Sequence, residues 1–541
     1  MASEDNSFDY IIVGAGSAGC VLANRLSADP AVRVALVEAG PSDHGFPQKI
    51  LIDVPAGINS VISNPRYNWS YVYETDARLG NRAIPCPRGR VLGGTSAING
   101  MVYVRGHRAD YARWAAEGAE GWSYDEVLPY FKKSENYQHG ASDYHGTGGE
   151  LDVQDQRDPN PVGQIAIEAA TQLQYRRTSD FNGAEQDGFG FWQVTQKKGA
   201  RASTARAFLD PAKNRPNLMV ITNALLERID LEGNRVVGIT VRRRDGGSPI
   251  LKARREVIIS GGAINSPQML LLSGIGPGAE LSALGIPVRH DLPGVGENLH
   301  DHQGIFLNWR SSDSRLYGLS WNALGWMAAS PFQYVVRRKG ALTTNTCEAG
   351  GFVRSLPDLD QPDLQLLFFP QFMNQPQHLI PRGHGFAWHA SLLQPKSRGK
   401  LSLKSARADE APRLQSGFLT HDDDLVGLIR GVKEIRRIVA TDAMAKARGE
   451  EVDPGATVQS DEEIAAFIRA NLGTTYHPVG TCKMGQDAMA VVDPKLRVRG
   501  LEGLRVIDAS VMPRVPSGNT NAPTIMIAER GADFIKAAWT H

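Results

Sequence analysis

The sequence predicts an α/β protein, in which a Rossmann-like domain on a parallel sheet is joined to an α+β domain on an antiparallel sheet. Three observations predict this class. An apolar, β-branched run at residues 10–13 is followed by glycines and then by helical periodicity. A second strand–turn–helix unit stands far along the chain, at 255–277. Segments 364–369, 388–394 and 400–405 alternate as the strands of an antiparallel sheet do.

The first unit carries the glycine spacing GxGxxG, at Gly14, Gly16 and Gly19. The first glycine permits a tight turn, the second lets the backbone approach a pyrophosphate, and the third lets helix and strand pack closely. The helix that follows offers free N–H groups and a partial positive charge to phosphates. These features together predict a dinucleotide cradle at residues 10–26.

The next strand, RVALVEAG, ends in Glu38, roughly 20 residues after the last glycine, where this fingerprint needs an acid for the ribose hydroxyls. An acid at this position disfavours a 2′-phosphate and therefore NADP. The pattern does not by itself distinguish NAD from FAD.

Residues 87–106, PRGRVLGGTSAINGMVYVRG, form a second glycine-rich stretch. Glycines there would let the backbone lie against a flat ligand. Asn99 and Gly100 then lead into residues 101–104, MVYV, which we expect to be a strand. The alternative is an ordinary glycine loop before a hairpin.

The unit at 255–277 contains an expected strand at 257–259, a turn at Gly261 and Gly262, and a helix that Ser266 and Pro267 are expected to start. The run SGIGP at 273–277 should stop that helix. This unit can join the same parallel sheet as the first.

The C-terminal part holds another expected strand, residues 504–508, which ends in Asp508. An acid at the carboxyl end of a parallel strand is well placed for ligand hydroxyls or bound water. Pro523 is typical of the first turn of a helix, so Asn521 stands at a helix start, where asparagine is also a common cap. His477 in TTYHPVGT has no reactive neighbour in sequence, and such a histidine alone is more often structural than catalytic.

Composition limits the possible functions. The 59 Lys and Arg nearly cancel the 58 Asp and Glu, so nothing indicates a nucleic-acid partner. The four cysteines are widely spaced, which argues against a disulfide scaffold or a cysteine zinc site, and we predict no metal site. No secretory signal or apolar run of spanning length is evident, so we expect a cytoplasmic protein that could also lie on the inner face of the cell membrane.

The glycine fingerprint, GRVLGGTSAINGMVYVRG, GAINSPQMLLLSGIG and the tail from YHPVGTCKMG to TIMIAE stand in the order found in one family. In these motifs, over nearly the whole chain, the sequence resembles the glucose–methanol–choline (GMC) oxidoreductases. YVRGH at 103–107 resembles the bacterial choline-dehydrogenase-like branch, and within it the enzymes that oxidise aliphatic alcohols and polyethylene glycol. The resemblance implies FAD and the following contact residues: Gly14, Gly16, Ser17, Gly19, Glu38, Ala39, Gly93, Asn99, Gly100, Met101, Val102, Asp508, Ala509, Pro523 and Thr524.

The resemblance also implies two catalytic residues, His477 and Asn521. A neutral imidazole can accept the hydroxyl proton of an alcohol while hydride passes to flavin N5, and an amide can hydrogen-bond the alcohol oxygen. Some family members attach FAD through a histidine just before the asparagine of the GGTSAIN loop. Ile98 stands there in this chain, so we expect FAD to be held non-covalently.

Because flavin motifs occur at both ends and in the middle, we expect a discontinuous FAD-binding domain. Its segments are 7–155, 215–310 and 471–541, the last with the catalytic residues. The substrate-binding domain comprises a minor segment, 156–214, and a main segment, 311–470.

We expect oxidation of a primary aliphatic or polyether alcohol to the aldehyde, with a quinone or similar electron acceptor. An oxidase that uses O₂ and a choline dehydrogenase remain alternatives, and a hydroxynitrile-lyase-like or a light-driven flavin enzyme is more remote. Segment 316–342 is rich in Trp, Phe, Met and Leu and then basic. It is expected to be a helical hairpin packed on the substrate domain, or a lid that contacts a membrane surface. The sequence does not indicate an oligomeric state.

Overall fold

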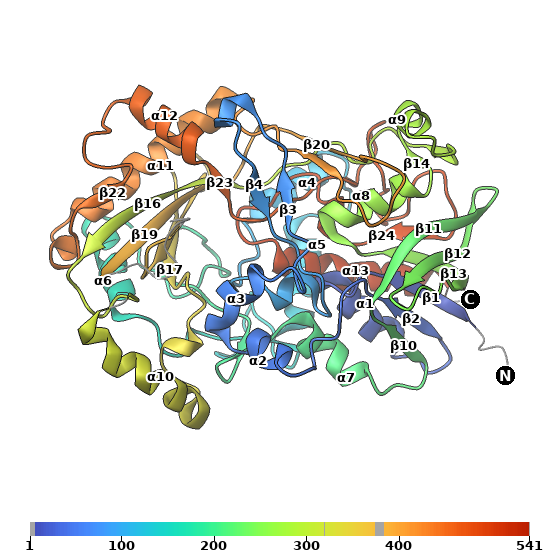
Figure 1. Ribbon diagram of the computed structural model, residues 1–541, viewed down its shortest axis with the longest axis horizontal. Coiled ribbons are helices and arrows are strands. Elements are labelled where there is room, and N and C mark those ends of the chain that lie inside the picture. The colour runs from blue at the N-terminus through green and yellow to red at the C-terminus, as the bar shows by residue number, and fades with distance from the viewer. Residues whose placement is uncertain (1–5, 319, 374–382, 540–541) are drawn as a thin grey trace.

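The computed structural model describes residues 6–318, 320–373 and 383–539. Two seven-stranded sheets lie toward opposite ends of the molecule (Figure 1). One is mostly parallel and holds the first and last motifs of the chain, and the other is antiparallel. The predicted fold class is therefore confirmed.

The mostly parallel sheet has the strand order β10–β2–β1–β13–β12–β11, and β24 also pairs with β13. Its strands are β1 (Ser7–Val13), β2 (Val34–Val37), β10 (Leu218–Ile221), β11 (Ala224–Glu232), β12 (Arg235–Arg243), β13 (Ile250–Ile259) and β24 (Leu504–Val506). The four strands predicted in the glycine-rich units and in the C-terminal part lie side by side in the order β2–β1–β13–β24 and pair in parallel. The predicted segments of these strands are buried and, apart from Arg505 in β24, apolar, as is usual for parallel strands covered on both faces.

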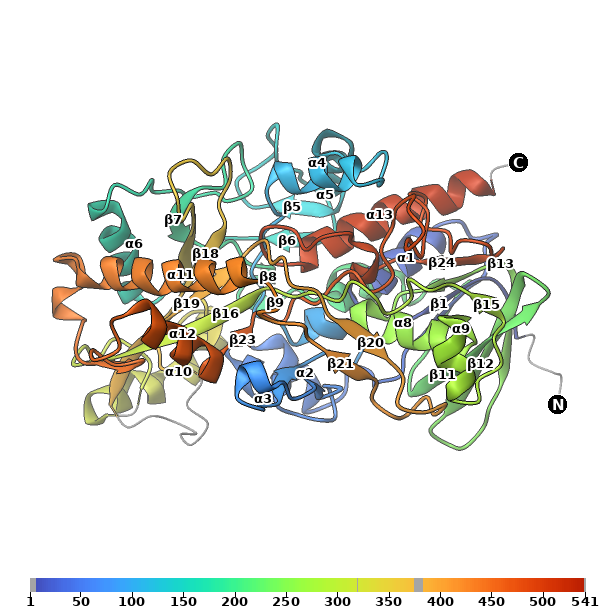
Figure 2. The ribbon, with the colours of Figure 1, turned by 90° about the horizontal axis from the view of Figure 1, so that it is seen from above.

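The helices on this sheet come from both ends of the chain. Helix α1 (Ser17–Leu26) follows β1, and α13 (Asn521–Ala538) packs beside it (Figure 2). The other long helices are α4 (Arg108–Ala116), α5 (Tyr124–Ser134), α6 (Pro161–Gln172), α8 (Gly262–Leu272), α10 (Leu324–Arg337), α11 (Asp422–Ala440) and α12 (Asp461–Asn471).

The antiparallel sheet has the order β22–β16–β19–β18–β17–β7, with β23 also beside β16. Its strands are β7 (Gly188–Phe191), β16 (Gln303–Ser311), β17 (Ala349–Val353), β18 (Leu364–Phe369), β19 (His384–Leu392), β22 (Glu451–Asp453) and β23 (Gly473–Thr474). The strands predicted at 364–369 and 388–394 are β18 and the second half of β19. Helix α11 packs against β16, β18 and β19 on one face of this sheet.

The strand predicted at 400–405 lies elsewhere. Strand β20 (Lys400–Ser402) pairs only with β21 (Arg413–Gln415), in a separate two-stranded sheet. Alternation of apolar and polar residues predicts a strand but not its partner, and here the nearby segment is the partner.

The strand predicted at residues 101–104 does not form. Only Val102 makes a bridge, to Val194. Met101 has a positive φ of 59° and its N–H donates to the side-chain oxygen of Asn99 at 3.0 Å. This side-chain turn takes the backbone out of the extended conformation that a strand needs.

Helix α8 begins at Gly262, four residues before the expected start, and Pro267 lies inside it. A proline in a helix leaves the carbonyl four residues earlier without its N–H partner. Here that carbonyl belongs to Ala263, and the Thr481 hydroxyl donates to it at 2.6 Å. A residue more than 200 positions away thus replaces the missing hydrogen bond. The helix ends before Gly274, as predicted.

The antiparallel sheet combines segments that are far apart in sequence. Strand β7 comes from the expected segment 156–214, and β17, β18 and β19 come from the expected segment 311–470. Strand β16 crosses the expected boundary at residue 310, and β23 lies just past residue 470. The domain boundaries themselves stay a prediction.

Segment 316–342, of which residue 319 lies outside the described part, contains one long helix, α10, rather than the expected hairpin. The helix projects from the molecule below the antiparallel sheet (Figure 1). None of the helices in the described part of the chain combines the length and the hydropathy needed to cross a bilayer.

Candidate active site

A cavity of about 430 Å³ lies between the two sheets, and both sheets contribute to its wall. Fourteen of the seventeen residues expected to bind cofactor or to act in catalysis line it. They are Gly14, Gly16, Ser17, Glu38, Ala39, Asn99, Gly100, Met101, Val102, His477, Asp508, Ala509, Asn521 and Thr524. Gly19, Gly93 and Pro523 do not line the cavity.

The turn between β1 and α1 forms one end of the cavity. Gly14 has a positive φ of 102°, and a Cβ there would lie 2.4 Å from the carbonyl oxygen of Ser260. A Cβ on Gly19 would lie 1.8 Å from the carbonyl oxygen of Gly14, so this glycine allows the helix to pack on the turn. Helix α1 has no side-chain cap and no acid in its first turn, which leaves its N–H groups free for an anion.

The Glu38 carboxylate is buried at the end of β2. Its two oxygens accept the N–H groups of Ala15 at 2.9 Å and Gly40 at 2.8 Å. Burial raises its pKa to about 7, although these two hydrogen bonds act in the opposite direction. Each oxygen keeps acceptor capacity, so the carboxylate can bind a diol such as a ribose.

The glycine loop at residues 93–102 is fixed by an arginine that the sequence analysis did not identify. The buried guanidinium of Arg201 donates to the Asn99 carbonyl at 2.6 Å and to the Asn99 side-chain oxygen at 3.0 Å. Burial lowers its pKa to about 9, although the charge of Asp53 acts in the opposite direction. Arg201 comes from the short β9 strand (Ala200–Arg201), and its sequence context carries no motif.

Asp508 follows β24 at the cavity wall, and groups of the protein already hydrogen-bond its carboxylate. It accepts the Ser266 hydroxyl at 2.5 Å and the N–H groups of Gly262 and Ser510, each at 2.8 Å. It thereby joins the end of β24 to the start of α8. Its expected contact with the cofactor stays a prediction, as do the other individual contacts.

The described residues fit a flavin dinucleotide. One continuous cavity contains an uncapped helix start at Ser17, a buried acid at Glu38 and a second uncapped helix start at Asn521. The two helix starts place partial positive charge at two separate points of the wall, which suits an extended ligand with a pyrophosphate and a second electron-rich part.

His477 lies at the wall of the same cavity, where the two sheets meet. Its Nε2 is 3.1 Å from the amide nitrogen of Asn519. Its Nδ1 is 3.0 Å from both the Thr475 hydroxyl and His302 Nδ1. Since an amide nitrogen only donates, the contacts fit the tautomer with the proton on Nδ1 and the lone pair on Nε2.

The backbone around His477 is fixed on both sides. Its N–H donates to Asp301 at 2.7 Å, and the Tyr73 hydroxyl donates to the other oxygen of that carboxylate at 3.0 Å. Tyr476 has a positive φ of 64°, which is unusual outside glycine, and its carbonyl accepts from Arg88. Such strain at a cavity wall persists only where the surroundings hold it in place.

The electrostatic environment keeps His477 neutral. Enclosure by the protein, then the nearby His302 and Arg88, lower the pKa of His477 well below 6.5. Burial also lowers the pKa of His302 to about 4. A neutral imidazole with a lone pair on Nε2, here hydrogen-bonded by the Asn519 amide, is a proton acceptor.

Asn521 makes no hydrogen bond with His477 in the described part of the chain. It is the first residue of α13, and its side-chain oxygen accepts the Ser17 hydroxyl at 2.7 Å, which links the starts of α13 and α1. Asn519 is the asparagine that reaches His477. The sequence GNTN contains both, two positions apart, and nothing in its pattern shows which one faces the histidine.

The antiparallel sheet and its neighbouring loops form the apolar side of the cavity. Val102, Phe306, Cys347, Leu367, Phe369 and Met373 line it, together with one buried histidine, His389. Such a surface suits the carbon chain of a small organic molecule next to His477.

Comparisons with known proteins agree with this arrangement. Profiles described as GMC oxidoreductase match residues 8–304 and 395–528. "Alcohol dehydrogenase [acceptor]" of Pseudomonas putida is 46% identical over 98% of this chain and 95% of its own length. "Choline dehydrogenase, mitochondrial" of Homo sapiens is 44% identical over 98% of this chain and 90% of its own. The crystal structure of pyridoxine 4-oxidase from Mesorbium loti is similar with a TM-score of 0.86 and 30% identity, over 97% of this chain and 98% of that one.

The GMC family binds FAD, and its alcohol and choline dehydrogenases, to which this chain is similar, act on alcohol-type substrates. The fingerprint, the two sheets and the position of His477 all agree with that chemistry. The resemblance expected from the sequence is confirmed: the chain belongs to the GMC oxidoreductase family and is an enzyme of that family.

Proposed function

We propose that the protein oxidises a primary alcohol, aliphatic or polyether, to the aldehyde with the help of bound FAD. The observation that carries the proposal is the position of His477. Its neutral imidazole presents the Nε2 lone pair to a cavity that has a dinucleotide cradle at one end and apolar side chains at the other.

In this mechanism His477 accepts the hydroxyl proton at Nε2, and its Nδ1–H remains held by Thr475 or His302. The Asn519 amide donates a hydrogen bond at the same place and can pass it to the alcohol oxygen as negative charge develops there. When bound, FAD supplies the hydride acceptor. The apolar wall excludes water and holds the carbon chain.

The cofactor in this proposal is held non-covalently. Ile98 lies directly before Asn99 at the cavity wall, and its hydrocarbon side chain has no atom that can bond to a flavin. Acid precipitation of the purified protein should therefore release all of the flavin into the supernatant. Flavin that stays with the precipitated chain would contradict this part of the proposal.

The cavity wall supports an uncharged alcohol rather than choline. Among the described lining residues the carboxylates are Glu38 and Asp508, and both already accept backbone N–H groups. The aromatic wall residues Phe306 and Phe369 can contact a quaternary ammonium group, but the described wall places no free acid beside them. The name "Alcohol dehydrogenase [acceptor]" of the Pseudomonas putida relative supports the same choice, with a quinone or a similar molecule as the acceptor.

An anaerobic titration tests the function. Primary alcohols of increasing chain length, ether alcohols and choline are added to the FAD-loaded protein, and the flavin absorbance is followed. We expect bleaching by the alcohols and little by choline. If no alcohol bleaches the flavin, the proposal is wrong.

The competing oxidase is favoured by no particular residue, but "Oxygen-dependent choline dehydrogenase" of Rhizobium johnstonii is 44% identical over 97% of this chain. Mixing the reduced protein with oxygen in a stopped-flow instrument separates the two acceptors. Slow reoxidation supports a dehydrogenase, whereas fast reoxidation with release of peroxide would support an oxidase.

The proposal includes an anionic membrane surface as a partner. Helix α10 and the turn before it expose a stripe formed by Trp321, Leu324, Phe332, Val335 and Val336, of which Trp321 is 90% exposed. The cations Arg337, Arg338 and Lys339 follow at the end of the stripe and are also exposed. A second copy of this face would bring like charges together, whereas anionic lipid complements both the apolar and the charged part.

Sedimentation with liposomes tests this contact. The protein should bind vesicles of mixed phosphatidylcholine and phosphatidylglycerol more strongly than phosphatidylcholine alone, and Phe332→Ser with Val335→Ser should abolish binding. Val426→Ser, an exposed apolar change on α11, serves as the matched control. Equal binding by all three proteins would contradict the contact.

A further inference from the structure

His389 lies on the inner face of the antiparallel sheet. It belongs to β19, where it lies opposite Phe306 of β16 and Leu367 of β18. Successive residues of β19 point to alternate faces of the sheet. Leu392 and Ala390 point toward α11, because an added Cβ on Gly427 would meet Leu392 and one on Gly431 would meet Ala390. His389 therefore faces away from α11 and toward the cavity, which it lines together with His477.

The ring of His389 packs into a space that neighbouring residues of β16 leave open. It packs edge-to-face on Phe306 with the ring centroids 4.3 Å apart. A Cβ on Gly304 would lie 2.1 Å from its Cε1 and 2.6 Å from its Nε2, so β16 carries a residue without a side chain where the ring lies. His389 is 1% exposed.

Neither ring nitrogen of His389 has a hydrogen-bond partner among the described residues. Leaving a buried polar group without a partner costs about 1–3 kcal/mol, and such groups are rare in folded proteins. Gln365 and Ser391, a facing pair one step along the same sheet face, also have unpaired atoms but do not line the cavity. Of these three polar residues, His389 is the one that lines the cavity.

The chemistry of this position limits what can satisfy it. Burial lowers the pKa of His389 to about 3, so the imidazole is neutral and offers one N–H donor and one lone pair. The neighbouring wall residues, Phe306, Leu367 and Phe369, offer no hydrogen bond of their own. A neutral donor in an apolar wall suits an uncharged oxygen atom.

We infer that His389 is a specificity-determining residue that hydrogen-bonds a second oxygen, ether or hydroxyl, on the carbon chain of the alcohol. The inference rests on the proposed function and names its substrate class more closely. The oxygen of such an alcohol accepts the imidazole N–H, whereas a plain alkanol leaves that donor unpaired and desolvated.

The experiment compares matched substrates. Primary alcohols of equal chain length are prepared in which one methylene is replaced by oxygen at successive distances from the carbinol carbon, and kcat/KM is measured for each relative to the plain alkanol. Wild-type protein should prefer the oxygen-containing alcohol by about tenfold at one or two positions. A series with an added hydroxyl at the same positions separates a preference for ethers from one for diols.

Two variants and a control assign that preference to the imidazole. His389→Leu should reduce the ratio to about one, and His389→Gln, which keeps a donor, should restore part of it. Leu367→Met changes the same wall without changing its polarity, and should shift both members of each pair together. Retained flavin absorbance and an unchanged Tm establish that each variant is folded and loaded.

The outcomes are distinguishable. If no alcohol bleaches the wild-type flavin, the proposed function fails and the inference fails with it. If wild-type protein oxidises alcohols but shows no position-dependent preference for oxygen, the inference alone is wrong, whether or not the variants fold. It is also wrong if His389→Leu leaves the preference unchanged, or lowers kcat/KM equally for all substrates.

Discussion

At the scale of single residues, His477 owes its properties to groups from distant parts of the chain. Thr475 is a near neighbour, but His302, Asp301 and Asn519 come from the turn before β16 and the loop before α13. The residue type and the motif could be predicted from the sequence. The contacts could not, because no periodicity relates residues that the fold alone brings together.

The pH dependence of catalysis follows from the lowered pKa of His477. The base is active when deprotonated, so activity is lost only as the pH falls through its pKa. We expect kcat/KM to stay level from pH 8 down through 6.5 and to fall at lower pH. A half-maximal value at or above pH 6.5 in a pH–rate profile would contradict a neutral, enclosed imidazole.

A pair of matched variants tests the roles of the two asparagines of GNTN separately. Asn519→Ala removes the donor at His477 Nε2 and should lower kcat/KM by about 10²-fold with FAD retained. Asn521→Ala removes the acceptor of the Ser17 hydroxyl and should weaken FAD retention more than turnover. Steady-state kinetics and flavin content of both proteins measure this. The opposite order of effects would favour Asn521 as the catalytic residue expected from the resemblance.

At the scale of elements, the sequence predicted the central strands well and the helix starts and strand partners less well. Apolar β-branched runs such as 257–259 have few alternatives to a buried strand. The start of α8 was misplaced because Pro267 is typical of a first turn, and the hydrogen bond that permits it inside the helix comes from Thr481. Likewise, alternation at 400–405 could not reveal that β21 is the partner.

Thr481→Val tests this account of α8. The change keeps the shape of the side chain but leaves the buried Ala263 carbonyl without a donor, and Pro267 cannot supply one. We expect the free energy of unfolding to fall by about 1–3 kcal/mol. Thr171→Val, at a partly buried threonine that bonds a carbonyl within its own helix, is the control and should have a smaller effect. Equal Tm values for the two variants would refute the compensating role of Thr481.

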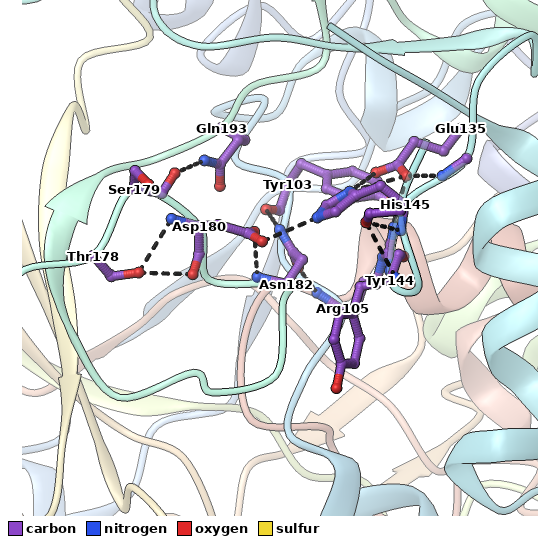
Figure 3. A network of polar contacts seen from close by, with 12 residues as sticks. Tyr103, Arg105, Glu135, Tyr144, His145, Thr178, Ser179, Asp180, Asn182 and Gln193 are labelled. Atoms are coloured by element: carbon purple, nitrogen blue, oxygen red, sulfur yellow. Dashed lines mark hydrogen bonds and ion pairs between the residues drawn. The ribbon is translucent and has the colours of Figure 1, made fainter. Parts of the chain in front are cut away.

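At the scale of the whole molecule, the sequence predicts that distant segments share one sheet, because flavin motifs recur along the chain. Which segments form the antiparallel sheet could not be predicted, because β7, β16 and β23 are short or lie near expected boundaries. A buried charged network also joins three separate segments (Figure 3). Arg105 pairs with Glu135 at 2.8 Å, and the two ring nitrogens of His145 contact Glu135 and Asp180, each at 3.1 Å.

This network makes stability depend on pH. Burial alone lowers the pKa of His145, but the hydrogen bonds to Asp180 and Glu135 outweigh it and the pKa is raised above 6.5. The imidazolium therefore stabilises the fold below pH 6.5, and this contribution is lost as the pH rises through the raised pKa. His145→Gln should lower the free energy of unfolding by about 3–5 kcal/mol at pH 6.

Thermal unfolding of both proteins at several pH values measures this effect. The difference in Tm between wild type and His145→Gln should narrow from pH 6 to pH 9. His139→Gln, at an exposed histidine that pairs with Asp155, is the control and should change Tm little. A difference that is constant over this pH range would show that His145 is not charged in the folded protein.

The most direct test of the central claim is the rate of flavin reduction by an alcohol in a single anaerobic turnover. FAD-loaded His477→Ala should reduce its flavin about 10²–10⁴ times more slowly than wild type, because the hydroxyl proton has no acceptor at that wall of the cavity. The flavin content should be unchanged, since His477 is not part of the dinucleotide cradle. A rate of flavin reduction near that of wild type would contradict the assignment of His477 as the base.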